Sequence, residues 1–427
     1  MAVAEKTPQT SPDTRAEVRA WLEDNWDPDL TVGEWWERLA EAGWATPAWP
    51  EEWMGRGLGR SDAAQVSAEI AEFGALGPPG GLGLMLAGPT IIAHGTDEQK
   101  ARYLPAIAKG QEAWCQLFSE PGAGSDLAGL QSRAVKDGDE WVVTGQKVWT
   151  SGGHSADLGM LLARTDPSVP KHKGISYFAL PMDQPGIDVR PLREMTGRAL
   201  FSEVFIDEAR VADDALIGGL NQGWAAAMTT LANERAGLGG GGGSEATSLA
   251  LPGQKAGQLE RRAGEFAAKG TRGTGTALAG RGHRLLMQVA RDLGRNDDPV
   301  VRQDLMRLYT LDKIAGWAVR RAKADAAAGR ATGGEANVAK LMMTHITRLS
   351  REVGLEILGA SGMLMGPETP SGGIVQELAL FSPAVSIYGG TDQVQRNILG
   401  ERALGLPREP RPDKDVAFSE LKVGTQG

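Results

Sequence analysis

The sequence IYGGTDQVQRNILGERALGLP, residues 387–407, combines a tight turn with the start of a helix. Two consecutive glycines, Gly389 and Gly390, let the backbone turn sharply and approach a ligand closely. A helix is predicted to begin at Asp392, and the N-terminus of a helix presents backbone N–H groups to polar or anionic ligands. The predicted helix carries three polar side chains, those of Gln393, Gln395 and Arg396. This stretch therefore predicts a backbone that binds an anionic or polar cofactor.

The length and composition of the chain are those of a multidomain globular protein. With 427 residues the chain is long enough to bury two or three hydrophobic cores. Hydrophobic residues make up 41% of the chain and charged residues 23%, and the mean hydropathy is -0.26. No window approaches the roughly 18 uninterrupted apolar residues of a membrane span, so no membrane partner is predicted. Residues 1–20 have the features of neither a secretory signal nor a transit peptide, which predicts a cytoplasmic protein.

Charge and cysteine content argue against two classes of function. The net charge of -9 disfavours a nucleic-acid partner, because binding to a phosphate backbone depends on clustered Lys and Arg. A single cysteine, Cys115, can form neither an internal disulfide nor a thiolate cluster, and the five histidines are scattered. No metal site is therefore predicted.

The predicted elements are first helices, then strands, then helices again, which indicates the α+β class. We predict an N-terminal helical domain at residues 1–112, a middle β domain at 113–218 and a C-terminal helical domain at 219–407. Within the last, residues 237–282 are rich in glycine and predict an insertion or loop around one short helix near 254–268. Residues 408–427 are rich in proline and charge and predict a tail that frays. The predicted strands are 114–118, 140–149, 158–164, 174–181 and 203–206.

Two further stretches combine glycines with short polar side chains. The first is FSEPGAGSDLAGL, residues 118–130, where Ser119, Ser125 and Asp126 lie among glycines that admit a flat ligand. From its residues alone this stretch fits a cofactor cradle and an ordinary Gly-Ser turn equally well. The second is KVWTSGG, residues 147–153, where the ring of Trp149 either stacks on a flat cofactor or packs against a hairpin.

Along the chain the three stretches are 118–130, 147–153 and 387–407. In this order they resemble the signatures of the acyl-CoA dehydrogenase family of flavoproteins. The resemblance extends over residues 13–407 and implies a helical N-terminal domain, a β-barrel middle domain and a C-terminal four-helix bundle. It implies FAD bound between the subunits of a homodimer, a homotetramer or a heteromeric assembly. The implied reaction oxidises an acyl-CoA thioester to a trans-2-enoyl-CoA, with the β-hydride passing to flavin N5. An electron-transfer flavoprotein is the implied electron acceptor.

The resemblance also implies roles for individual residues. Flavin contacts are implied for Gln116, Phe118, Ser119, Trp149 and Ser151, with Trp149 stacking on the ring and Ser151 bonding to N5. Ser125 matches a residue that meets the pantetheine arm of coenzyme A. Thr391 and Gln393 match residues that reach the FAD of a neighbouring subunit.

Two implied FAD contacts depart from the pattern of the family. Glu356 stands where the family often has a glutamine before a glycine-rich turn, and a carboxylate there would approach the pyrophosphate. The Arg-x-x-Phe-Gly element of the family is present only as Ala-Arg-Asp-Leu-Gly, so Arg291 either replaces the usual arginine or is surface charge.

The largest departure concerns the catalytic base. Many members of the family carry a glutamate directly after the tyrosine that corresponds to Tyr388, but this chain has Gly389. In a subset of the family the glutamate lies on the first helix of the C-terminal domain, directly before an arginine, and this position matches Glu234 and Arg235. We therefore predict Glu234 as the base, Arg235 and Tyr388 as substrate contacts, and the Gly389 N–H as a donor to the thioester carbonyl. An exposed charged patch is the alternative interpretation of Glu234 and Arg235.

Two other functions remain open from the sequence. The same scaffold could serve a flavin oxidase or monooxygenase, or a dehydrogenase of acyl groups bound to a carrier protein. Alternatively, Gly389, Glu356 and the irregular Arg291 element fit a non-catalytic subunit paired with a catalytic one. Neither the length nor the branching of the acyl group can be deduced, although Gly389 leaves room for a branched or ring-bearing substrate.

Overall fold

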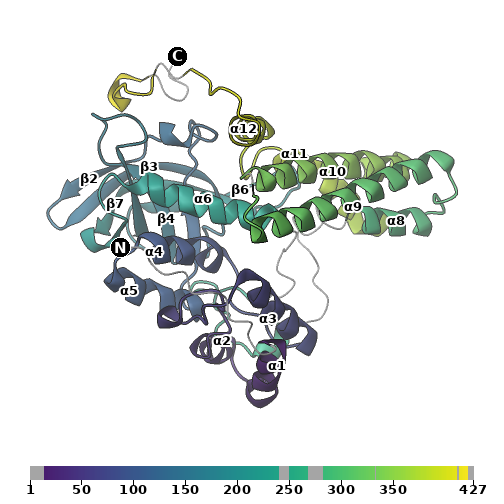
Figure 1. Ribbon diagram of the computed structural model, residues 1–427, viewed down its shortest axis with the longest axis horizontal. Helices are drawn as coiled ribbons and strands as arrows, with labels where there is room; N and C mark the ends of the chain where they lie inside the picture. The colour runs from purple at the N-terminus through teal and green to yellow at the C-terminus, as the bar shows by residue number, and fades with distance from the viewer. Residues whose placement is uncertain (1–13, 240–249, 268–281, 332, 411–412, 422–427) are drawn as a thin grey trace.

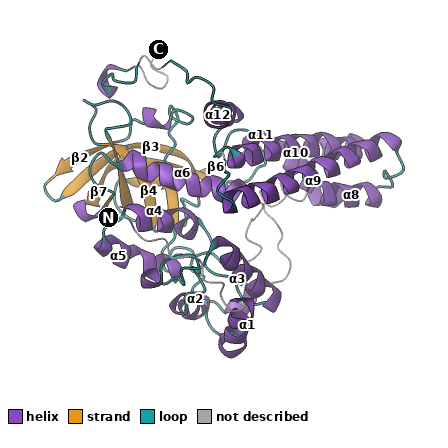
Figure 2. Ribbon diagram, in the orientation of Figure 1, coloured by secondary structure: helices purple, strands orange, loops and turns teal. Residues whose placement is uncertain are grey.

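The computed structural model describes residues 14–239, 250–267, 282–331, 333–410 and 413–421. Figure 1 shows three parts: N-terminal helices, a β-sheet, and a bundle of long helices that extends away from the sheet. Figure 2 shows that the strands are confined to the middle part. The predicted α+β class and the order of helical, β and helical regions are therefore confirmed.

The N-terminal region is a set of helices that pack around tryptophan side chains. Trp35 and Trp36 are fully buried, and their indole N–H groups donate to the carbonyls of Leu76 and Gly77. Thr96 begins α5 with a reciprocal capping box in which its partner is Gln99. The helices of this region are α1 (Thr14–Asn25), α2 (Val32–Glu41), α3 (Arg60–Phe73), the π-helix η2 (Gly83–Ala87), α4 (Gly88–His94) and α5 (Asp97–Ala108).

The middle region is one eight-stranded sheet in the order β6-β7-β3-β2-β4-β5-β8, with β1 paired to β4. Strands β2 and β3 form an antiparallel hairpin around the turn after Asp137. The ring of Trp141 on β3 lies 5.6 Å from that of Phe178 on β5, so the sheet curves strongly around a shared core. The strands are β1 (Trp114–Leu117), β2 (Arg133–Asp137), β3 (Glu140–Ser151), β4 (Leu158–Arg164), β5 (Ile175–Pro181), β6 (Ile187–Leu192), β7 (Phe201–Ala212) and β8 (Leu216–Ile217).

The C-terminal region contains the long helices. Helix α6 (Gly223–Gly239) runs from the sheet toward the bundle in Figure 1. Asp298 begins the longest helix by accepting the N–H groups of Val300 and Val301. Apolar side chains of α8, α9, α10 and α11 form a second core, which includes Leu286, Leu308 and Val353. The bundle helices are α8 (Gly282–Asp292), α9 (Pro299–Ala327), α10 (Glu335–Leu358) and α11 (Ile374–Val385), and the short α12 (Asp392–Ile398) follows them.

The short helix predicted near residues 254–268 does not form in the described part of that segment. Residues 250–267 contain only a 3-10 turn, Ala263–Glu265. Their backbone instead pairs with the N-terminal region, where Leu259 and Arg261 accept the N–H groups of Gly33 and Val32. These bonds use backbone groups that a helix would need for itself, which explains why the local propensity is overridden.

The C-terminal tail does not fray throughout, contrary to the prediction. Phe418 and Ser419 donate their N–H groups to the carbonyls of Val169 and Pro167, at 2.9 Å each. The Arg164 guanidinium lies 3.4 Å from the centroid of the Phe418 ring. Arg164 also donates to the carbonyls of Ala128 and Leu130, so the tail docks beside the stretch 118–130.

Replacing Phe418 by alanine is expected to release this segment from the sheet. The loss of the cation–π contact with a desolvated guanidinium should cost about 1–2 kcal/mol. Limited trypsin digestion, followed at the exposed Lys414, should then cleave the variant faster than the parent protein. Equal cleavage rates would show that the ring does not hold the tail.

Candidate active site

A β-bulge in β3 exposes the ring of Trp149. The register between β3 and β7 shifts between Lys147 and Thr150, so β3 has one more residue than its partner there. Trp149 has φ 62°, which is unfavourable for a bulky residue, and its side chain is 59% exposed. The ring of Phe201 packs against that of Trp149 in a T-shaped arrangement, with centroids 5.9 Å apart. A strained, uncovered aromatic ring beside Ser151 fits the stacking surface for a flat cofactor.

A buried ion pair fixes the stretch 118–130 to the same bulge. Lys147 is fully buried, and its Nζ lies 2.8 Å from Glu120 Oε1 and 3.1 Å from the carbonyl of Phe118. Although burial alone would raise the pKa of Glu120, the charge of Lys147 holds it below its ordinary value. The N–H of Val148 donates to the Ser119 carbonyl at 2.9 Å. The Lys147–Glu120 pair therefore connects the two predicted flavin-binding stretches, 118–130 and 147–153. The resemblance to the family implied no role for either residue.

Glu234 lies on α6 opposite Gln116 of β1. The Gln116 Nε2 atom donates to Glu234 Oε2 at 3.4 Å. Burial raises the pKa of Glu234, while the Gln116 bond and the charge of Arg235 oppose this rise. The helix is held in place by Thr230, whose hydroxyl lies 2.8 Å from that of Thr90 on α4. Glu234 and Arg235 are both partly buried, so they do not form an exposed charged patch.

Arg235, the next residue on α6, lies close enough to a positive charge in the C-terminal region for that charge to affect its pKa. Burial lowers the pKa of Arg235, and the positive charge of Arg402 lowers it further. Arg402 belongs to the π-helix η8 (Leu399–Ala403), which directly follows α12. The side of α6 that carries Glu234 and Arg235 is therefore near the end of the stretch 387–407.

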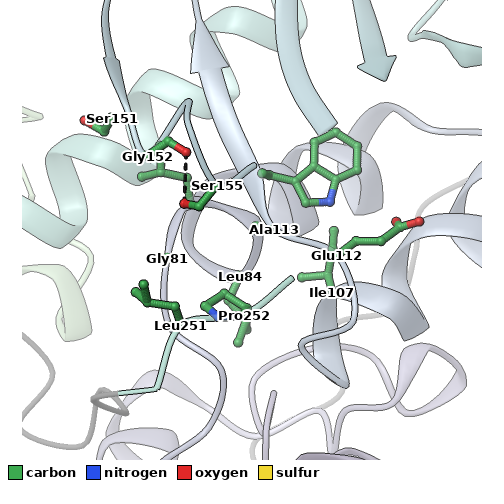
Figure 3. Close-up of a pocket in the computed structure, with 14 residues that line it drawn as sticks. Gly81, Leu84, Ile107, Glu112, Ala113, Ser151, Gly152, Ser155, Leu251 and Pro252 are labelled. Atoms are coloured by element: carbon green, nitrogen blue, oxygen red, sulfur yellow. Dashed lines mark hydrogen bonds between the residues drawn. The ribbon is translucent and has the colours of Figure 1, made fainter. Parts of the chain in front are cut away.

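A pocket of about 260 Å³ lies between the N-terminal helices and the sheet. Figure 3 shows Ser151 and Gly152 on one side of it and Glu112 on the other. Its volume is slightly below the roughly 300–1,000 Å³ of typical small-molecule sites. The apolar part of the lining is formed by Leu82, Leu84, Ile107, Leu251 and Pro252.

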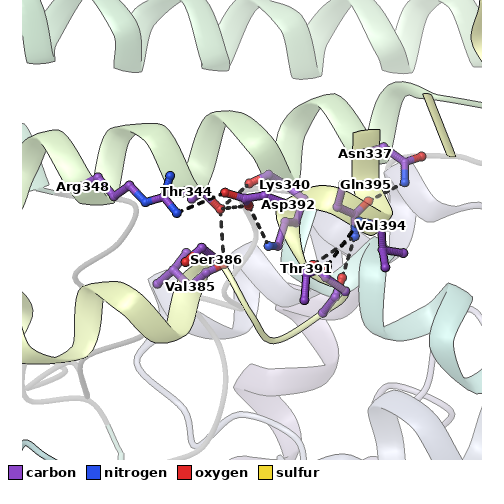
Figure 4. A network of polar contacts seen from close by, with 12 residues as sticks. Asn337, Lys340, Thr344, Arg348, Val385, Ser386, Thr391, Asp392, Val394 and Gln395 are labelled. Carbon is purple, nitrogen blue, oxygen red and sulfur yellow. Dashed lines mark hydrogen bonds and ion pairs between the residues drawn. The ribbon is translucent and has the colours of Figure 1, made fainter. Parts of the chain in front are cut away.

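Gln395 of α12 and side chains of α10 hold the turn at residues 387–391 in place (Figure 4). Gly389 and Gly390 have φ of 63° and 85°, left-handed values that favour glycine. Gln395, which is 1% exposed, donates to the Gly389 carbonyl at 2.7 Å and accepts a bond from Asn337. Gln395 of α12 binds the Gly389 carbonyl, and Asn337 of α10 binds Gln395. The two helices therefore set the orientation of this carbonyl. Of the three polar side chains that the sequence places on this helix, that of Gln395 is therefore buried and supports the turn.

Asp392 anchors the start of α12 through three side chains of α10. Its carboxylate lies 3.4 Å from Lys340, accepts the Thr344 hydroxyl at 3.0 Å and lies 3.3 Å from Arg348. These three residues follow one another at helical spacing, so they form a single stripe of α10. Asp392 and Lys340 are both almost fully buried.

Replacing Asp392 by asparagine is expected to lower the free energy of unfolding by about 1–3 kcal/mol, because Lys340 would remain buried without a counter-charge. The Thr344 bond can persist, which limits the loss. Thermal unfolding measures the change, and Asp24→Asn on the exposed side of α1 is the matched control. An unchanged melting temperature in the Asp392 variant would contradict this role for the network.

Several residues with predicted ligand contacts lie apart from these groups. Ser125 and Gln393 are exposed, and Thr391 uses its hydroxyl to cap α12 by accepting the Val394 N–H at 3.2 Å. Arg291 is exposed and donates to the carbonyl of Met287 in its own helix, and Glu356 is exposed on α10. Their ligand contacts stay predictions.

Arg295, which the motif comparison missed, lies beside the turn that follows Glu356. Its Nη1 atom is 4.0 Å from the position that a Cβ atom of Gly359 would take, and Gly359 has φ 54°. Arg295 also pairs with Asp298 at 3.1 Å. The positive charge at this turn therefore comes from a residue four positions after Arg291.

The residues around Trp149 fit the flavin end of FAD. Trp149 offers a stacking face, and the Thr150 hydroxyl is buried without a hydrogen-bond partner within the described chain. Gln116 and Ser151 add an amide and a hydroxyl nearby. No grouping of three or more potential metal ligands occurs among the described residues, and none of the described helices is long and apolar enough to cross a membrane.

Comparison with family models gives three matches, which together span most of the chain. Residues 12–111 match the N-terminal domain of acyl-CoA dehydrogenases, residues 115–209 the middle domain and residues 272–404 the C-terminal domain.

Among curated proteins, acyl-CoA dehydrogenase IpdE1 of Mycobacterium tuberculosis is 36% identical over 417 residues, covering 93% of this chain and 98% of the relative. Acyl-CoA dehydrogenase FadE34 of the same organism is 38% identical over 375 residues, but this chain matches only 46% of its length.

Among solved structures, the Tcur3481-Tcur3483 steroid ACAD has a TM-score of 0.69 and 30% identity, with 92% of this chain and 97% of that chain covered. The ChsE4-ChsE5 complex from Mycobacterium tuberculosis has a TM-score of 0.68 and 28% identity, with 95% and 100% covered.

Proposed function

This chain belongs to the acyl-CoA dehydrogenase family of oxidoreductases, and we propose that it oxidises an acyl-CoA thioester to a trans-2-enoyl-CoA with Glu234 as the base. The observation that carries the proposal is the position of Glu234: a carboxylate on α6, bonded to Gln116 of β1, with a pKa raised by burial. Such a carboxylate is a stronger base than one in water, as removal of a weakly acidic α-proton requires.

The other groups have supporting roles. Trp149 and Ser151 would hold the flavin of FAD, which accepts the hydride when bound. The Gly389 N–H is proposed to donate to the thioester carbonyl, which would acidify the α-proton. Gly389 itself cannot supply a base, and its left-handed backbone favours glycine, so the carboxylate must come from another element. The name of the solved steroid ACAD favours a ring-bearing acyl group.

The rate should depend on pH through Glu234. Only the carboxylate form accepts a proton, so kcat/KM should fall as the pH is lowered through the pKa of Glu234. Because burial raises this pKa above its ordinary value of 4.5, the acidic limb should lie above that pH. Gln116→Leu removes a bond that lowers the pKa, so its limb should move to higher pH. Profiles of kcat/KM against pH, recorded on the FAD-saturated parent protein and on Gln116→Leu, give the midpoint of the acidic limb of each. Identical midpoints would contradict the Gln116–Glu234 coupling.

Anaerobic titration of the FAD-loaded protein with short, long, branched and ring-bearing acyl-CoAs tests the function. Loss of the flavin absorbance with at least one of them is expected. Bleaching by none would favour an oxidase or monooxygenase acting on another substrate, or a carrier-bound acyl group. An electron-transfer flavoprotein is the proposed acceptor, and it should reoxidise the bleached protein.

A second candidate is that the chain works within a heteromeric assembly. Glu356 stands where the family often has a glutamine, and the element around Arg291 departs from the Arg-x-x-Phe-Gly pattern, which fits a chain that depends on a partner to hold FAD. The ChsE4-ChsE5 relative is named as a complex of two chains. If this candidate holds, the chain purified alone should lack FAD and should gain it with a partner chain. A yellow, active homo-oligomer would exclude it.

A further inference from the structure

Residues of the segment 250–267 form part of the wall of the pocket in Figure 3. This segment lies between the match to the middle domain and the match to the C-terminal domain, so no matched family domain includes it. Its residues Leu251 and Pro252 nevertheless line the same pocket as Ser151 and Gly152. In Figure 3, Leu251 and Pro252 lie at one end of the pocket and Ser151 and Gly152 at the other. One end of the pocket is therefore formed by residues outside the matched domains.

Hydrogen bonds fix this segment in position on both sides of Pro252. The Leu251 N–H donates to the side-chain oxygen of Gln258 at 2.8 Å, which closes a turn within the segment. The Gly253 N–H donates to the Gly110 carbonyl at 2.9 Å, just before β1. The bonds to residues 32–33 described above hold the later part of the segment on the N-terminal region. The backbone therefore determines where Leu251 meets the pocket.

Two glycines let the segment approach the pocket closely. Gly253 has φ 95°, and a Cβ atom at this position would overlap with Asp157 Oδ2 and with the Cβ atom of Ala113. Across the pocket wall, a Cβ atom on Gly81 would lie 3.7 Å from Pro252 Cγ, so no side chain separates the Gly81 backbone from the proline ring. A side chain at position 253 would therefore push the segment away from its seat beside β1.

Strand β1 places this pocket next to the groups of the proposed reaction. Trp114 lines the pocket, and Gln116, two residues later on the same strand, binds Glu234. Side chains two residues apart in a strand point to the same face and are about 7 Å apart along it. The pocket therefore extends along β1 from the neighbourhood of Glu234 and Ser151 toward the segment 250–267.

Resting on the proposed function, which places the reacting carbons near Ser151 and Glu234, we propose that Leu251 and Pro252 limit the size of the acyl group. They form an apolar wall that the far end of the acyl group meets. The preferred substrate is then an acyl-CoA with a compact, apolar acyl group. Leu251 is 50% exposed, so its replacement changes the pocket without removing a core side chain.

Two matched thioesters test this limit: the CoA esters of 3-cyclohexylpropanoate and 3-(4-tert-butylcyclohexyl)propanoate, which differ only at the end far from the thioester. Calorimetric binding to the FAD-loaded protein, which needs no turnover, should show the compact ester binding at least about tenfold more tightly than the bulky one. Leu251→Ala shortens the wall and should bring this ratio toward one. Leu251→Phe extends the wall and should raise the ratio above that of the parent protein.

Two further variants assign the effect to the wall. Leu220→Ala is the matched control, because Leu220 is also 50% exposed but lies outside the pocket lining, and it should leave the ratio unchanged. Gly253→Val introduces a side chain where the segment meets Asp157, so it should displace the wall and lower the ratio as Leu251→Ala does. Circular dichroism confirms that each variant is folded.

The outcomes separate the size limit from the reaction. Equal binding of the two esters to the parent protein, or the parent ratio in folded Leu251→Ala, would overturn the size limit even if acyl-CoAs reduce the flavin. Leu251-dependent selection of the compact ester without any flavin reduction would support the size limit and count against the proposed reaction.

Discussion

Replacing Glu234 by glutamine is expected to lower kcat/KM for the best acyl-CoA by about 10²- to 10⁴-fold, the usual contribution of a general base. Glutamine has nearly the same size and can keep a bond to Gln116, but its amide does not accept a proton at neutral pH. The variant should therefore fold and bind FAD as the parent does. Steady-state assays with an artificial electron acceptor measure the rate, and the visible spectrum measures the FAD content.

The control for this variant is Glu23→Gln. Glu23 is an exposed carboxylate on α1, remote from the sheet, so its replacement should change neither the rate nor the FAD content. If Glu234→Gln kept the parent rate, the base would lie elsewhere in the chain. If it lost FAD as well as activity, Glu234 would have a structural role that the present geometry does not require.

Replacing Lys147 by methionine is expected to lower the free energy of unfolding by about 3–5 kcal/mol, the usual cost of breaking a buried ion pair. Methionine leaves the Glu120 carboxylate buried without its cation and removes the bond to the Phe118 carbonyl. Because the pair ties the stretch 118–130 to the bulge at Trp149, FAD should also bind more weakly. Urea unfolding measures the stability, and titration of the apoprotein measures the FAD affinity.

A second substitution distinguishes loss of charge pairing from poor packing. Glu120→Gln in the Lys147→Met background removes the unpaired charge, so the double variant should recover part of the lost stability. Lys173→Met, at an exposed position in the turn before β5, is the surface control and should change stability by less than about 0.5 kcal/mol. A double variant no more stable than Lys147→Met would show that the charge of Glu120 is not the source of the loss.

The overall fold could be predicted from the sequence because its signals are local. The sequence predicts a strand at 158–164, and β4 spans Leu158–Arg164. Helical periodicity and runs of apolar residues specify such elements directly. β7 was predicted only at 203–206 but spans Phe201–Ala212. Its second half carries Asp207, Glu208 and Arg210 on an exposed side, so it lacks the apolar pattern of a buried strand.

What could not be predicted depends on contacts between residues far apart in sequence. The tail at 413–421 is charged and proline-rich, yet Phe418 docks on Arg164, more than 250 positions earlier. Gln395 and Asp392 look like surface residues of a polar helix, but Asn337 and Lys340 of α10 bury them. Nothing in the local sequence encodes these partners.

Within the candidate site, the motif stretches point to Trp149 and the glycine at 389 points to Glu234, and the roles of both residues stay predictions. The structure brings Gln116 to Glu234, while the Thr391, Gln393, Arg291 and Glu356 contacts with a ligand stay predictions. Some of those contacts were expected to reach a neighbouring subunit, so a single chain does not test them. Arg295, four residues after Arg291, is the arginine near the Gly359 turn. The sequence does not predict this change of position, because the family's Arg-x-x-Phe-Gly pattern is irregular here.

The most direct test of the account is whether Glu234 removes the α-proton. A 3-thiaacyl-CoA has sulfur in place of the β-carbon and so offers no β-hydride, which isolates proton removal from oxidation. In deuterated water the FAD-loaded parent protein should exchange the α-protons of this compound, as followed by NMR or mass spectrometry. Glu234→Gln should slow the exchange by about 10²- to 10⁴-fold. Exchange at the parent rate in Glu234→Gln would contradict the assignment of the base.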